Sequence, residues 1–425
     1  MRGSILWRKV LIAFALTPAA AWPDAGTTLE PGALADEVLA ANPAAAAASA
    51  RAEAYDRAAA AEGLWPDPQL TVEASNLPAG DLAFDRSPMS GLQFYLRQTI
   101  PLPGKNTYRR RAAEGGAAAA AAELETTRRE LVERAKHAYF DLYLATALRD
   151  VVEKQRAFWV DYGRVALARY AAGRGLQADV LKAQVERTLT ANELLELSRH
   201  ETVARGHINV LLNRAPDYDL PPLAGLPEAT VPYTLEELYD KALANDPGVA
   251  AAEALLASAR AARSLAKASF LPDLTAGVGY RLREEVPMDP VAGEDFWSFS
   301  AGVSLPLFGT VKHSRTLAEK SAAVSAAEAN AADVKNNLLR EVEELYVAKR
   351  TAEEQLVLFE EGILPQAEAA LRSTLAAYEA GKVDFTALLQ SELTLFKYEK
   401  EYVGVQVRRH KALASLEAVV GERFY

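Results

Sequence analysis

Cysteine is absent from the 425-residue sequence, and aromatic residues make up only 8% of it. The absence of cysteine excludes a disulfide scaffold, a thiolate metal site, a cysteine nucleophile and attachment to a membrane through a lipid-modified cysteine. Half of the chain is hydrophobic, but much of that half is alanine. Because alanine favours helices and buries little area per residue, the composition predicts closely packed helices rather than one large globular core.

Positive charges are outnumbered by negative ones, 47 to 57, and long hydrophobic runs are scarce. The net charge of −10 disfavours a nucleic-acid partner, which would need a basic surface. After residue 21, no segment offers the roughly 18 strongly apolar residues that a transmembrane helix requires. The sequence therefore excludes a membrane protein built from spanning helices.

The N-terminus has the pattern of a secretory signal peptide. Three basic residues precede a short apolar run at 10–16, and Ala19 and Ala21 offer a small-residue cleavage site. We therefore expect residues 1–21 to direct export and then to be removed. Loss of the three cations would change the net charge from −10 to −13 (−10 − 3).

The rest of the chain contains an internal repeat. Four short motifs recur at offsets between 204 (243 − 39) and 208 (378 − 170) residues, which indicates a tandem duplication. The predicted organisation is a signal peptide at 1–21, a first structural repeat at 22–214, an equatorial linker at 215–233 and a second repeat at 234–425. The matching motifs are 39–43 with 243–247, 65–67 with 271–273, 100–104 with 305–309, and 170–173 with 378–381.

Each half contains two runs in which apolar residues alternate with polar or small ones. Period-two alternation predicts strands, and each run is long enough to cross a bilayer if it is tilted. The apolar positions are Leu70, Val72 and Ala74, then Leu92, Phe94 and Leu96 in the first half, and Leu274, Ala276, Val278 and Tyr280, then Phe299, Ala301, Val303 and Leu305 in the second.

Long helices follow the strands in each half. Residues 105–170 contain no proline and predict a helical rod of roughly 100 Å. Helices at 177–213 and 235–269 are expected to stack end to end beside it, with the proline-rich linker bulging out at the join.

The second half repeats this pattern. A rod at 312–377 should kink near Gly362 and Pro365. A helix at 384–420 is expected to stack on the N-terminal helix at 33–64. The apolar residues of 384–420 that predict a coiled-coil seam are Leu389, Leu393, Phe396, Val403 and Val407.

Four strands cannot span a bilayer alone, because an open sheet would leave edge groups unpaired in hydrocarbon. Three copies of four strands would give 12, an even number within the range of outer-membrane barrels. The predicted fold is therefore mainly α with a transmembrane β-barrel portion. A trimeric 12-stranded barrel, with four strands from each chain, would continue into a long α-helical coiled-coil barrel that crosses the periplasm.

The sequence resembles the TolC-type outer-membrane efflux channels. The resemblance covers 31–422 and rests on the duplicated strand-strand-helix-helix order, the Tyr-x-x-Gly turns at 170–173 and 378–381, the run 179–184, and the helix end at 212–213. It implies a homotrimer in the outer membrane that contacts outer-membrane lipid and docks onto a periplasmic adaptor and an inner-membrane pump of the RND type. The nonapeptide 97–105 is most similar to the heavy-metal branch, the cobalt-zinc-cadmium efflux components.

The functional residues that the resemblance implies lie at two helix-hairpin tips. Gly173, Gly175 and Leu176, with Gly381 and Val383, would meet the adaptor. The family closes its periplasmic end with aspartate rings six residues past the turn glycine, a position that Asp179 matches after Gly173. After Gly381 the matching residue is Ala387, and Gln390 stands where a second acidic residue would be expected. Asp384 or Glu392 would then substitute, or closure would rest on Asp179 alone.

The sequence indicates the passage of substrates and no chemical reaction. No nucleophile elbow, phosphate-binding loop or metal-ligand spacing occurs, so no catalytic group, cofactor or bound metal is predicted. The favoured function is the exit duct of an efflux system, with metal ions as the expected cargo. The alternative is a soluble periplasmic coiled-coil adaptor or scaffold. The two duplicated strand pairs favour the duct, because a scaffold does not need them. The five histidines are scattered, at His137, His200, His207, His313 and His410.

Overall fold

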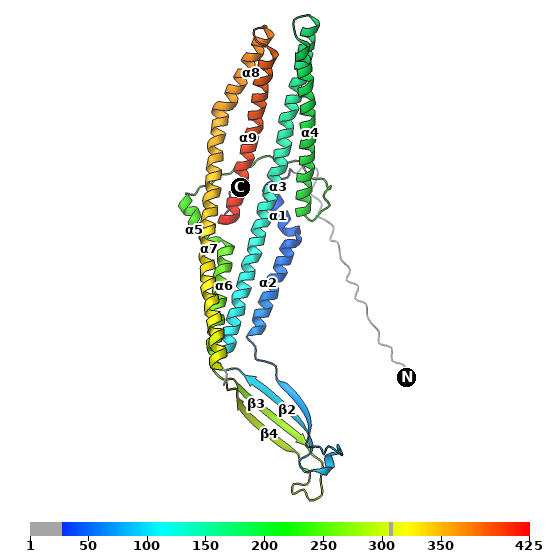
Figure 1. Cartoon of the computed structure of the whole chain (residues 1–425), viewed down its shortest axis with the longest axis vertical. Coiled ribbons are helices and arrows are strands. Elements are labelled where there is room, and N and C mark those ends of the chain that lie inside the picture. The colour runs from blue at the N-terminus through cyan, green and yellow to red at the C-terminus, as the bar shows by residue number, and fades with distance from the viewer. Residues whose placement is uncertain (1–27, 306–308) are drawn as a thin grey trace, which may run out of the picture.

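The computed structural model describes residues 28–305 and 309–425. The predicted signal peptide at 1–21 and part of the motif at 305–309 lie outside the described residues. The chain forms long helical rods with a small antiparallel sheet at one end (Figure 1).

The two halves of the chain have the same order of elements. Two short helices lead to two strands, and a long rod and a return helix follow. The first half contains α1 (Pro31–Ala41), α2 (Pro43–Glu62), β1 (Gln69–Ser75), a 3-10 turn (Phe84–Arg86), β2 (Gly91–Ile100), α3 (Lys105–Ala171) and α4 (Gln177–Leu211). The second contains α5 (Leu235–Asn245), α6 (Pro247–Ala268), β3 (Leu274–Leu282), β4 (Phe296–Val303), α7 (Gly309–Leu358), a π-helical turn (Phe359–Ile363), α8 (Leu364–Glu379) and α9 (Phe385–Val420).

The helices predicted at 33–64 and 235–269 are each divided in two. The breaks fall at Asn42-Pro43 and Asp246-Pro247, where proline has no N–H to donate to the preceding turn. Asn42 and Asp246 then cap the second helix, because their side chains accept hydrogen bonds from the N–H groups of Ala44 (2.9 Å) and Val249 (2.8 Å). The repeated proline marks a start of a new helix rather than a position inside one.

The kink predicted near Gly362 and Pro365 takes the form of one π-helical turn. The N–H of Leu364 bonds to the carbonyl of Phe359, five residues back. Pro365 lacks an N–H and sits in the first turn of α8. An extra residue in the turn lets the rod continue past the missing donor.

The stacking of the short helices differs from the prediction. Within the first half, α4 ends above α2, and within the second half, α9 ends above α6 (Figure 1). Asn42 donates to the carbonyl of Leu211 at 2.8 Å, and Asn245 donates to the carbonyl of Val420 at 3.3 Å. These side chains bond the exposed carbonyls at the ends of the return helices. Each repeat therefore builds its own stacked rod, and the predicted stacking of 177–213 on 235–269 and of 384–420 on 33–64 is wrong.

The linker at 215–233 is mostly irregular. It crosses the molecule at the level of the two joints, the places where α4 ends above α2 and where α9 ends above α6. Leu29 forms a short parallel bridge with Leu223, and its N–H donates to the carbonyl of Pro222 at 2.8 Å. The Tyr139 hydroxyl donates to the carbonyl of Gly225 at 2.7 Å. These contacts tie the linker to the segment before α1 and to α3.

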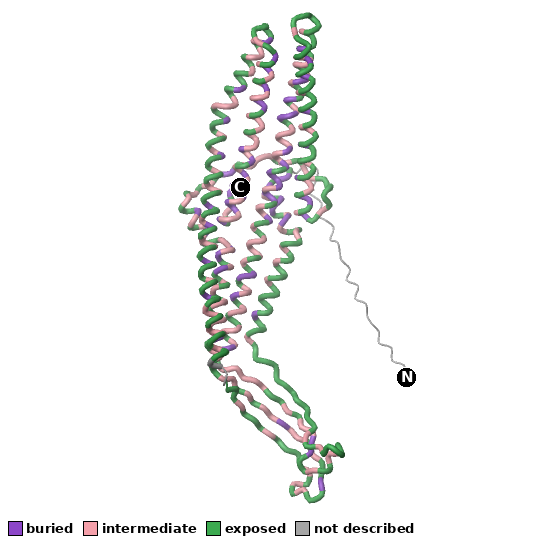
Figure 2. The backbone as a smooth tube through the Cα atoms, viewed as in Figure 1, coloured by how far each residue is buried: buried purple, intermediate pink, exposed green. Residues whose placement is uncertain are grey.

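The largest hydrophobic clusters lie at the same level as the joints, and buried residues elsewhere follow the lines along which the rods touch (Figure 2). One cluster joins α1, α3 and α4 around Tyr139 and Phe140. Another joins α5, α7 and α9 around Leu238 and Leu413. The rods therefore have no single thick core, as the alanine-rich composition predicts.

The seam predicted on α9 is only partly correct. Phe396 and Val407 are buried, whereas Leu389, Leu393 and Val403 are only partly buried. Toward the hairpin tip, the buried positions are displaced by one residue. They are Phe385, Leu388, Glu392 and Leu395.

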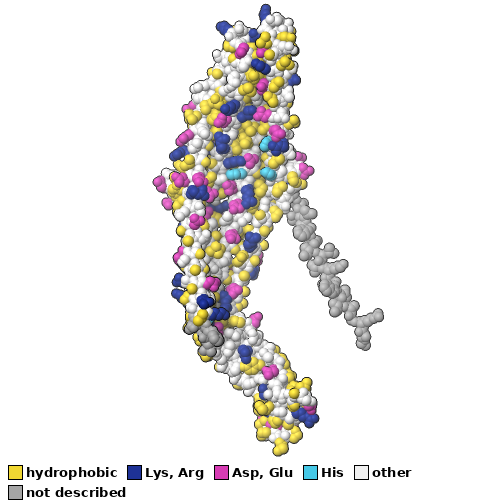
Figure 3. All heavy atoms as spheres, viewed as in Figure 1, with side chains coloured by type: hydrophobic (Ala, Val, Ile, Leu, Met, Phe, Trp, Pro, Cys, Tyr) yellow, Lys and Arg dark blue, Asp and Glu magenta, His cyan; other side chains and the backbone are white. Residues whose placement is uncertain are grey.

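Acidic and basic side chains alternate over the visible face of the helical part, without a large patch of one sign (Figure 3). Over the described ranges, 28–305 and 309–425, none of the helices is both long enough and apolar enough to cross a membrane.

A buried ion pair connects the two repeats beside the joints. Lys136 of α3 bonds to Glu417 of α9, and their side chains are 4% and 5% exposed. Glu417 also accepts the N–H of Phe424, and the Lys136 ammonium lies 4.2 Å from the centre of the Tyr425 ring. This pair holds the end of α9 and the segment after it against α3.

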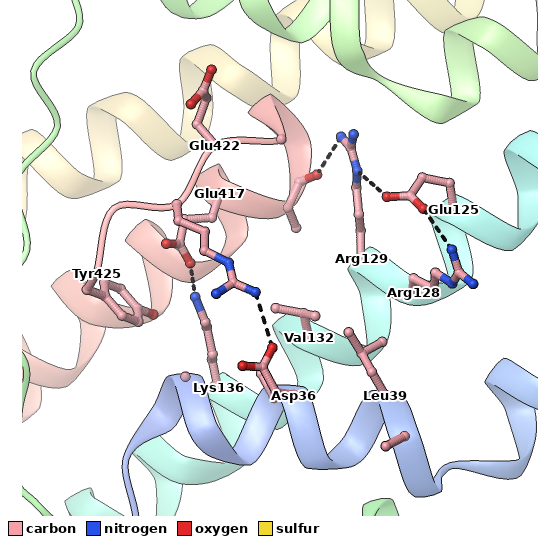
Figure 4. Close-up of a pocket in the computed structure, with 16 residues that line it drawn as sticks. Asp36, Leu39, Glu125, Arg128, Arg129, Val132, Lys136, Glu417, Glu422 and Tyr425 are labelled. Atoms are coloured by element: carbon pink, nitrogen blue, oxygen red, sulfur yellow. Dashed lines mark hydrogen bonds and ion pairs between the residues drawn. The ribbon is translucent and has the colours of Figure 1, made fainter.

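A pocket of about 650 Å³ opens beside this pair, between α1, α3 and the end of α9 (Figure 4). Arg423 crosses it to Asp36 at 3.1 Å. Arg129 donates to the carbonyls of Asn245 at 3.0 Å and Ala418 at 3.3 Å. The charges that line the pocket are used to hold the joints together.

Replacement of Lys136 tests the role of the buried pair. Lys136→Met leaves the Glu417 carboxylate buried without its cation, so we expect the free energy of unfolding to fall by about 3–5 kcal/mol. Chemical denaturation of the purified protein measures this loss. The double variant Lys136→Met/Glu417→Leu removes both charges and should recover most of it, and an equal loss in both variants would contradict the role of the ion pair.

Candidate functional site

The four strands form one sheet in the order β1-β2-β3-β4, and every neighbouring pair is antiparallel. The register brings the apolar positions of all four strands onto one face, so the predicted alternation is confirmed. Two rows across this face are Leu70-Leu96-Val278-Phe299 and Val72-Phe94-Tyr280-Trp297.

The other face of the sheet carries polar and small residues, with Phe296 at its outer end as the exception. Its rows, from the helical end outward, are Thr99-Thr275-Gly302, Gln69-Arg97-Gly277-Ser300, Thr71-Tyr95-Gly279-Ser298 and Glu73-Gln93-Arg281-Phe296. Hydrogen bonds cross this face: Gln93 Nε2 donates to Ser298 Oγ at 3.2 Å, and the Tyr95 and Ser300 hydroxyls bond to each other.

One chain leaves the apolar face uncovered. Phe299 is 80% exposed and Trp297 is 65% exposed, although both are large hydrophobic residues. The outer edges of β1 and β4 also have no partner strand in the described part of the chain. A sheet with one apolar face, one polar face and two open edges is suited to a closed wall with lipid outside and water inside.

The two hairpin tips at the opposite end of the molecule share one turn geometry. Gly173 and Gly381 adopt positive φ angles of 69° and 72°, which glycine reaches without steric cost. After each glycine, an N–H bonds five residues back: Arg174 to the carbonyl of Arg169, and Lys382 to that of Ala377, both at 2.8 Å. These bonds satisfy the carbonyls at the helix ends, and the predicted turns are confirmed.

The docking residues predicted at the tips differ in their surroundings. Leu176 is 68% exposed at the start of α4. Gly175 is close to the backbone of α3, because a Cβ there would lie 3.3 Å from the N atom of Tyr170. Val383 packs against the cluster around Trp159. Leu176 is therefore the large apolar side chain of this set that is open to a partner.

Arg169 links the two tips, although the sequence interpretation did not select it. Its guanidinium lies over the ring of the buried Tyr378, 4.4 Å from the ring centre, and donates to the Tyr378 carbonyl at 2.6 Å. Burial raises the pKa of Tyr378, the charge of Arg169 opposes this shift, and nearby Asp179 reinforces it. A basic residue directly before the Tyr-x-x-Gly turn of the first repeat was the available signal, but its partner lies in the second repeat.

The predicted gate residues do not occupy equivalent places. Asp179 lies in the first turn of α4 and is partly exposed. Asp384 caps α9, because its carboxylate accepts the N–H of Ala387 at 2.9 Å. Gln390 is exposed on α9. Asp179 is therefore the acidic member of the set that is close to Tyr378 and has no capping bond to its own helix in the described residues.

Glu392 is a core residue of α9, in the part of the helix toward the hairpin tip. Its side chain is fully buried, and among the described residues neither carboxylate oxygen has a hydrogen-bond partner. It lies one turn after Leu388, which packs on Trp159 of α3. Burial raises the pKa of Glu392 to about 9, and nearby Glu186 reinforces the shift while Lys400 opposes it. Glu392 is therefore a neutral acid at pH 7.

His200 and His207 of α4 line one pocket, and the other histidines lie on other helices. No group of three or more metal-ligating side chains in the described part of the chain is arranged to hold a metal ion. His137 Nε2 lies 3.1 Å from the Ser415 hydroxyl, and burial lowers the pKa of His410 to about 4, so that this ring is neutral at pH 7.

Comparison with known proteins begins with a family model. The model described as "Outer membrane efflux protein" matches residues 34–214 and 238–422. A curated relative is the cobalt-zinc-cadmium resistance protein CzcC of Cupriavidus metallidurans. It is 26% identical over 327 residues, which cover 76% of this chain and 75% of CzcC.

Solved channels have the same fold. The outer-membrane channel OprN superposes with a TM-score of 0.79 at 20% identity, covering 93% of this chain and 90% of OprN. CusC, whose structures describe transmembrane channel formation, superposes with a TM-score of 0.79 at 17% identity, covering 95% of this chain and 96% of CusC.

The buried acid on α9 predicts a pH-dependent stability. Between about pH 4.5 and 9 the folded protein keeps the Glu392 proton that the unfolded chain has lost, so this group lowers the unfolding free energy as pH rises. The Glu392→Gln variant lacks this fall in the free energy of unfolding, because glutamine does not ionise. Relative to the wild type, we expect its stability gain to grow from almost nothing near pH 4.5 to about 3 kcal/mol near pH 7.

Denaturation midpoints of both proteins across this pH range test the expectation. Glu401→Gln changes an exposed carboxylate on the same helix and serves as the matched control. A constant difference between wild type and Glu392→Gln at every pH would show that Glu392 does not carry the proton.

Proposed function

This chain belongs to the Outer membrane efflux protein family, and from that membership we propose that it is the exit duct of a tripartite efflux system. As a member of the family it is an outer-membrane efflux channel, not an enzyme. In the proposed system it passively conducts substrates that an inner-membrane pump of the RND type and a periplasmic adaptor hand over.

The two-faced sheet is the observation that carries the proposal. Three copies would pair the open edge of β1 with the β4 edge of the next copy and close a barrel of 12 strands. Closure would place Phe299 and Trp297 against outer-membrane lipid and the row around Tyr95 in water. The rods, with α3 alone roughly 100 Å long, would extend the duct through the periplasm.

The proposed partners meet the opposite end. Leu176 is exposed there beside a turn that contains Gly173 and Gly175, and an apolar side chain next to glycines, which allow close approach of a backbone, can receive the hairpin of an adaptor. Gly173, Gly175, Gly381 and Val383 complete the proposed docking tips. The likeness to CzcC, a cobalt-zinc-cadmium resistance protein, supports metal ions as the cargo.

We place the periplasmic gate at Asp179. Three copies would bring three carboxylates together around the axis, where their field would favour cations. The link from Arg169 to Tyr378 holds the two hairpins of one copy together near this point. Asp384 caps its helix and Glu392 is buried, so we assign them supporting roles, with Gln390 on the exposed face of α9.

Cell fractionation tests the duct against the alternative of a periplasmic scaffold. We expect the protein in the outer-membrane fraction, as an oligomer on gels that dissociates to a chain of about 45.9 kDa or slightly less only after heating. The closed sheet edges of a barrel resist detergent until heat separates them. Recovery as a soluble monomer would overturn the channel proposal.

Conductance in planar bilayers tests the gate. Asp179→Ala removes three charges from the closed end, and we expect a higher single-channel conductance together with weaker preference for cations. Asp179→Glu keeps the charge and serves as the matched control. Conductance and selectivity equal to wild type in Asp179→Ala would contradict the assignment.

A further inference from the structure

The polar face of the sheet carries few charges. On the described strands they are Glu73 of β1, Arg97 of β2 and Arg281 of β3. All other positions on this face are uncharged, and several are glycine or serine. The charge of the barrel lumen in the proposed channel therefore depends on these three side chains.

Glu73 and Arg281 share one row across the sheet. Gln93 lies between them, pairs with Glu73 in the register and accepts a hydrogen bond from Arg281 Nη2 at 3.0 Å. Each copy thus contributes one negative and one positive charge at this level. In a closed trimer this row has no net charge.

Arg97 stands two rows nearer the helices, and its row has no acidic residue. Its neighbours across the sheet are Gln69, Gly277 and Ser300. Arg97 is exposed, and its guanidinium lies 5.5 Å from the centre of the Tyr95 ring, a contact that leaves its charge in place. Tyr95 itself leans over Gly277, where an added Cβ would collide with the Tyr95 hydroxyl.

Two other cations at the borders of the sheet are neutralised by carboxylates. Lys105 pairs with Asp273 at 2.7 Å where α3 begins, and Arg283 pairs with Asp289 at 2.6 Å in the loop beyond β3. Arg97, in contrast, has no carboxylate within ion-pair distance among residues 28–305 and 309–425. The uncompensated charge on the polar face is therefore positive and belongs to Arg97.

We propose that three copies of Arg97 form a positive ring at the helical end of the barrel lumen and that this ring favours small anions over small free cations, so that a metal cation handed over by the pump would cross this level against the field of the ring. The proposal rests on the proposed trimeric channel. A ring of like charges in a pore raises the local concentration of counter-ions and repels ions of its own sign. Its sign is opposite to that of the Asp179 carboxylates at the far end, so the two ends of the duct discriminate differently.

Reversal potentials across a planar bilayer under a potassium chloride gradient test the ring. We expect Arg97→Gln to lower the chloride-to-potassium permeability ratio by about fivefold when the more dilute side is about 10 mM, where the Debye length of about 30 Å exceeds the lumen radius. At about 1 M salt the Debye length of about 3 Å screens the ring, and the difference should vanish.

Two further variants control for structure and for sign. Arg97→Lys keeps the charge and should retain the wild-type ratio. Glu73→Gln removes a negative charge from the neutral row and should raise the ratio, which keeps the test decisive if Arg97→Gln does not assemble. Unchanged reversal potentials at low salt in conducting Arg97→Gln channels would overturn the role of Arg97, whereas a wild type that never conducts would overturn the proposed channel and the ring with it.

Discussion

The architecture depends on two joints at which one helix ends and another begins in line with it. At each joint a proline stops one helix, a capping residue starts the next, and an asparagine side chain bonds the last carbonyls of the return helix. Without these bonds, the carbonyls at the end of α4 and α9 would meet the next helix unpaired. The joints convert α2 with α4, and α6 with α9, into two stacked partners that run beside the long rods.

The ends of the molecule follow from the joints. Because each stacked pair runs beside its own rod, both strand pairs leave the helices at the same end and both hairpin tips lie at the other (Figure 1). The sheet therefore receives β2 beside β3, and the order β1-β2-β3-β4 joins the two repeats. A single chain can neither cover the apolar face of this sheet nor pair its two free edges. These two features are the physical reason for assembly in the proposed duct.

Buried polar groups mark the places where the rods are held to one another. Lys136 and Glu417 compensate each other beside the joints, whereas Glu392 occupies a core position near the tips as a neutral acid. The first arrangement stabilises one geometry, because separation would leave two buried charges. The buried Glu392 lowers the free energy of unfolding as pH rises, because its ionisation would require water to enter the contact between α9 and its neighbours.

Local patterns in the sequence determined most of the elements. The alternation of the strands, the proline-free rod of α3 and the Tyr-x-x-Gly turns depend on neighbouring residues, and the structure has all of them. The duplication also predicted the same order of elements in both halves. The sequence placed Glu392 among the gate residues because its spacing from Gly381 was all that the chain order revealed.

Tertiary structure decided which elements meet. The sequence order suggested that α4 would stack on α5 and α6, because they are consecutive, but the capping bonds of Asn42 and Asn245 act within each repeat. Likewise, the link from Arg169 to Tyr378 joins residues 209 positions apart, and the isolation of Arg97 depends on its neighbours across three other strands. Such pairings depend on register and stacking, which arise only when distant segments compete for the same surfaces.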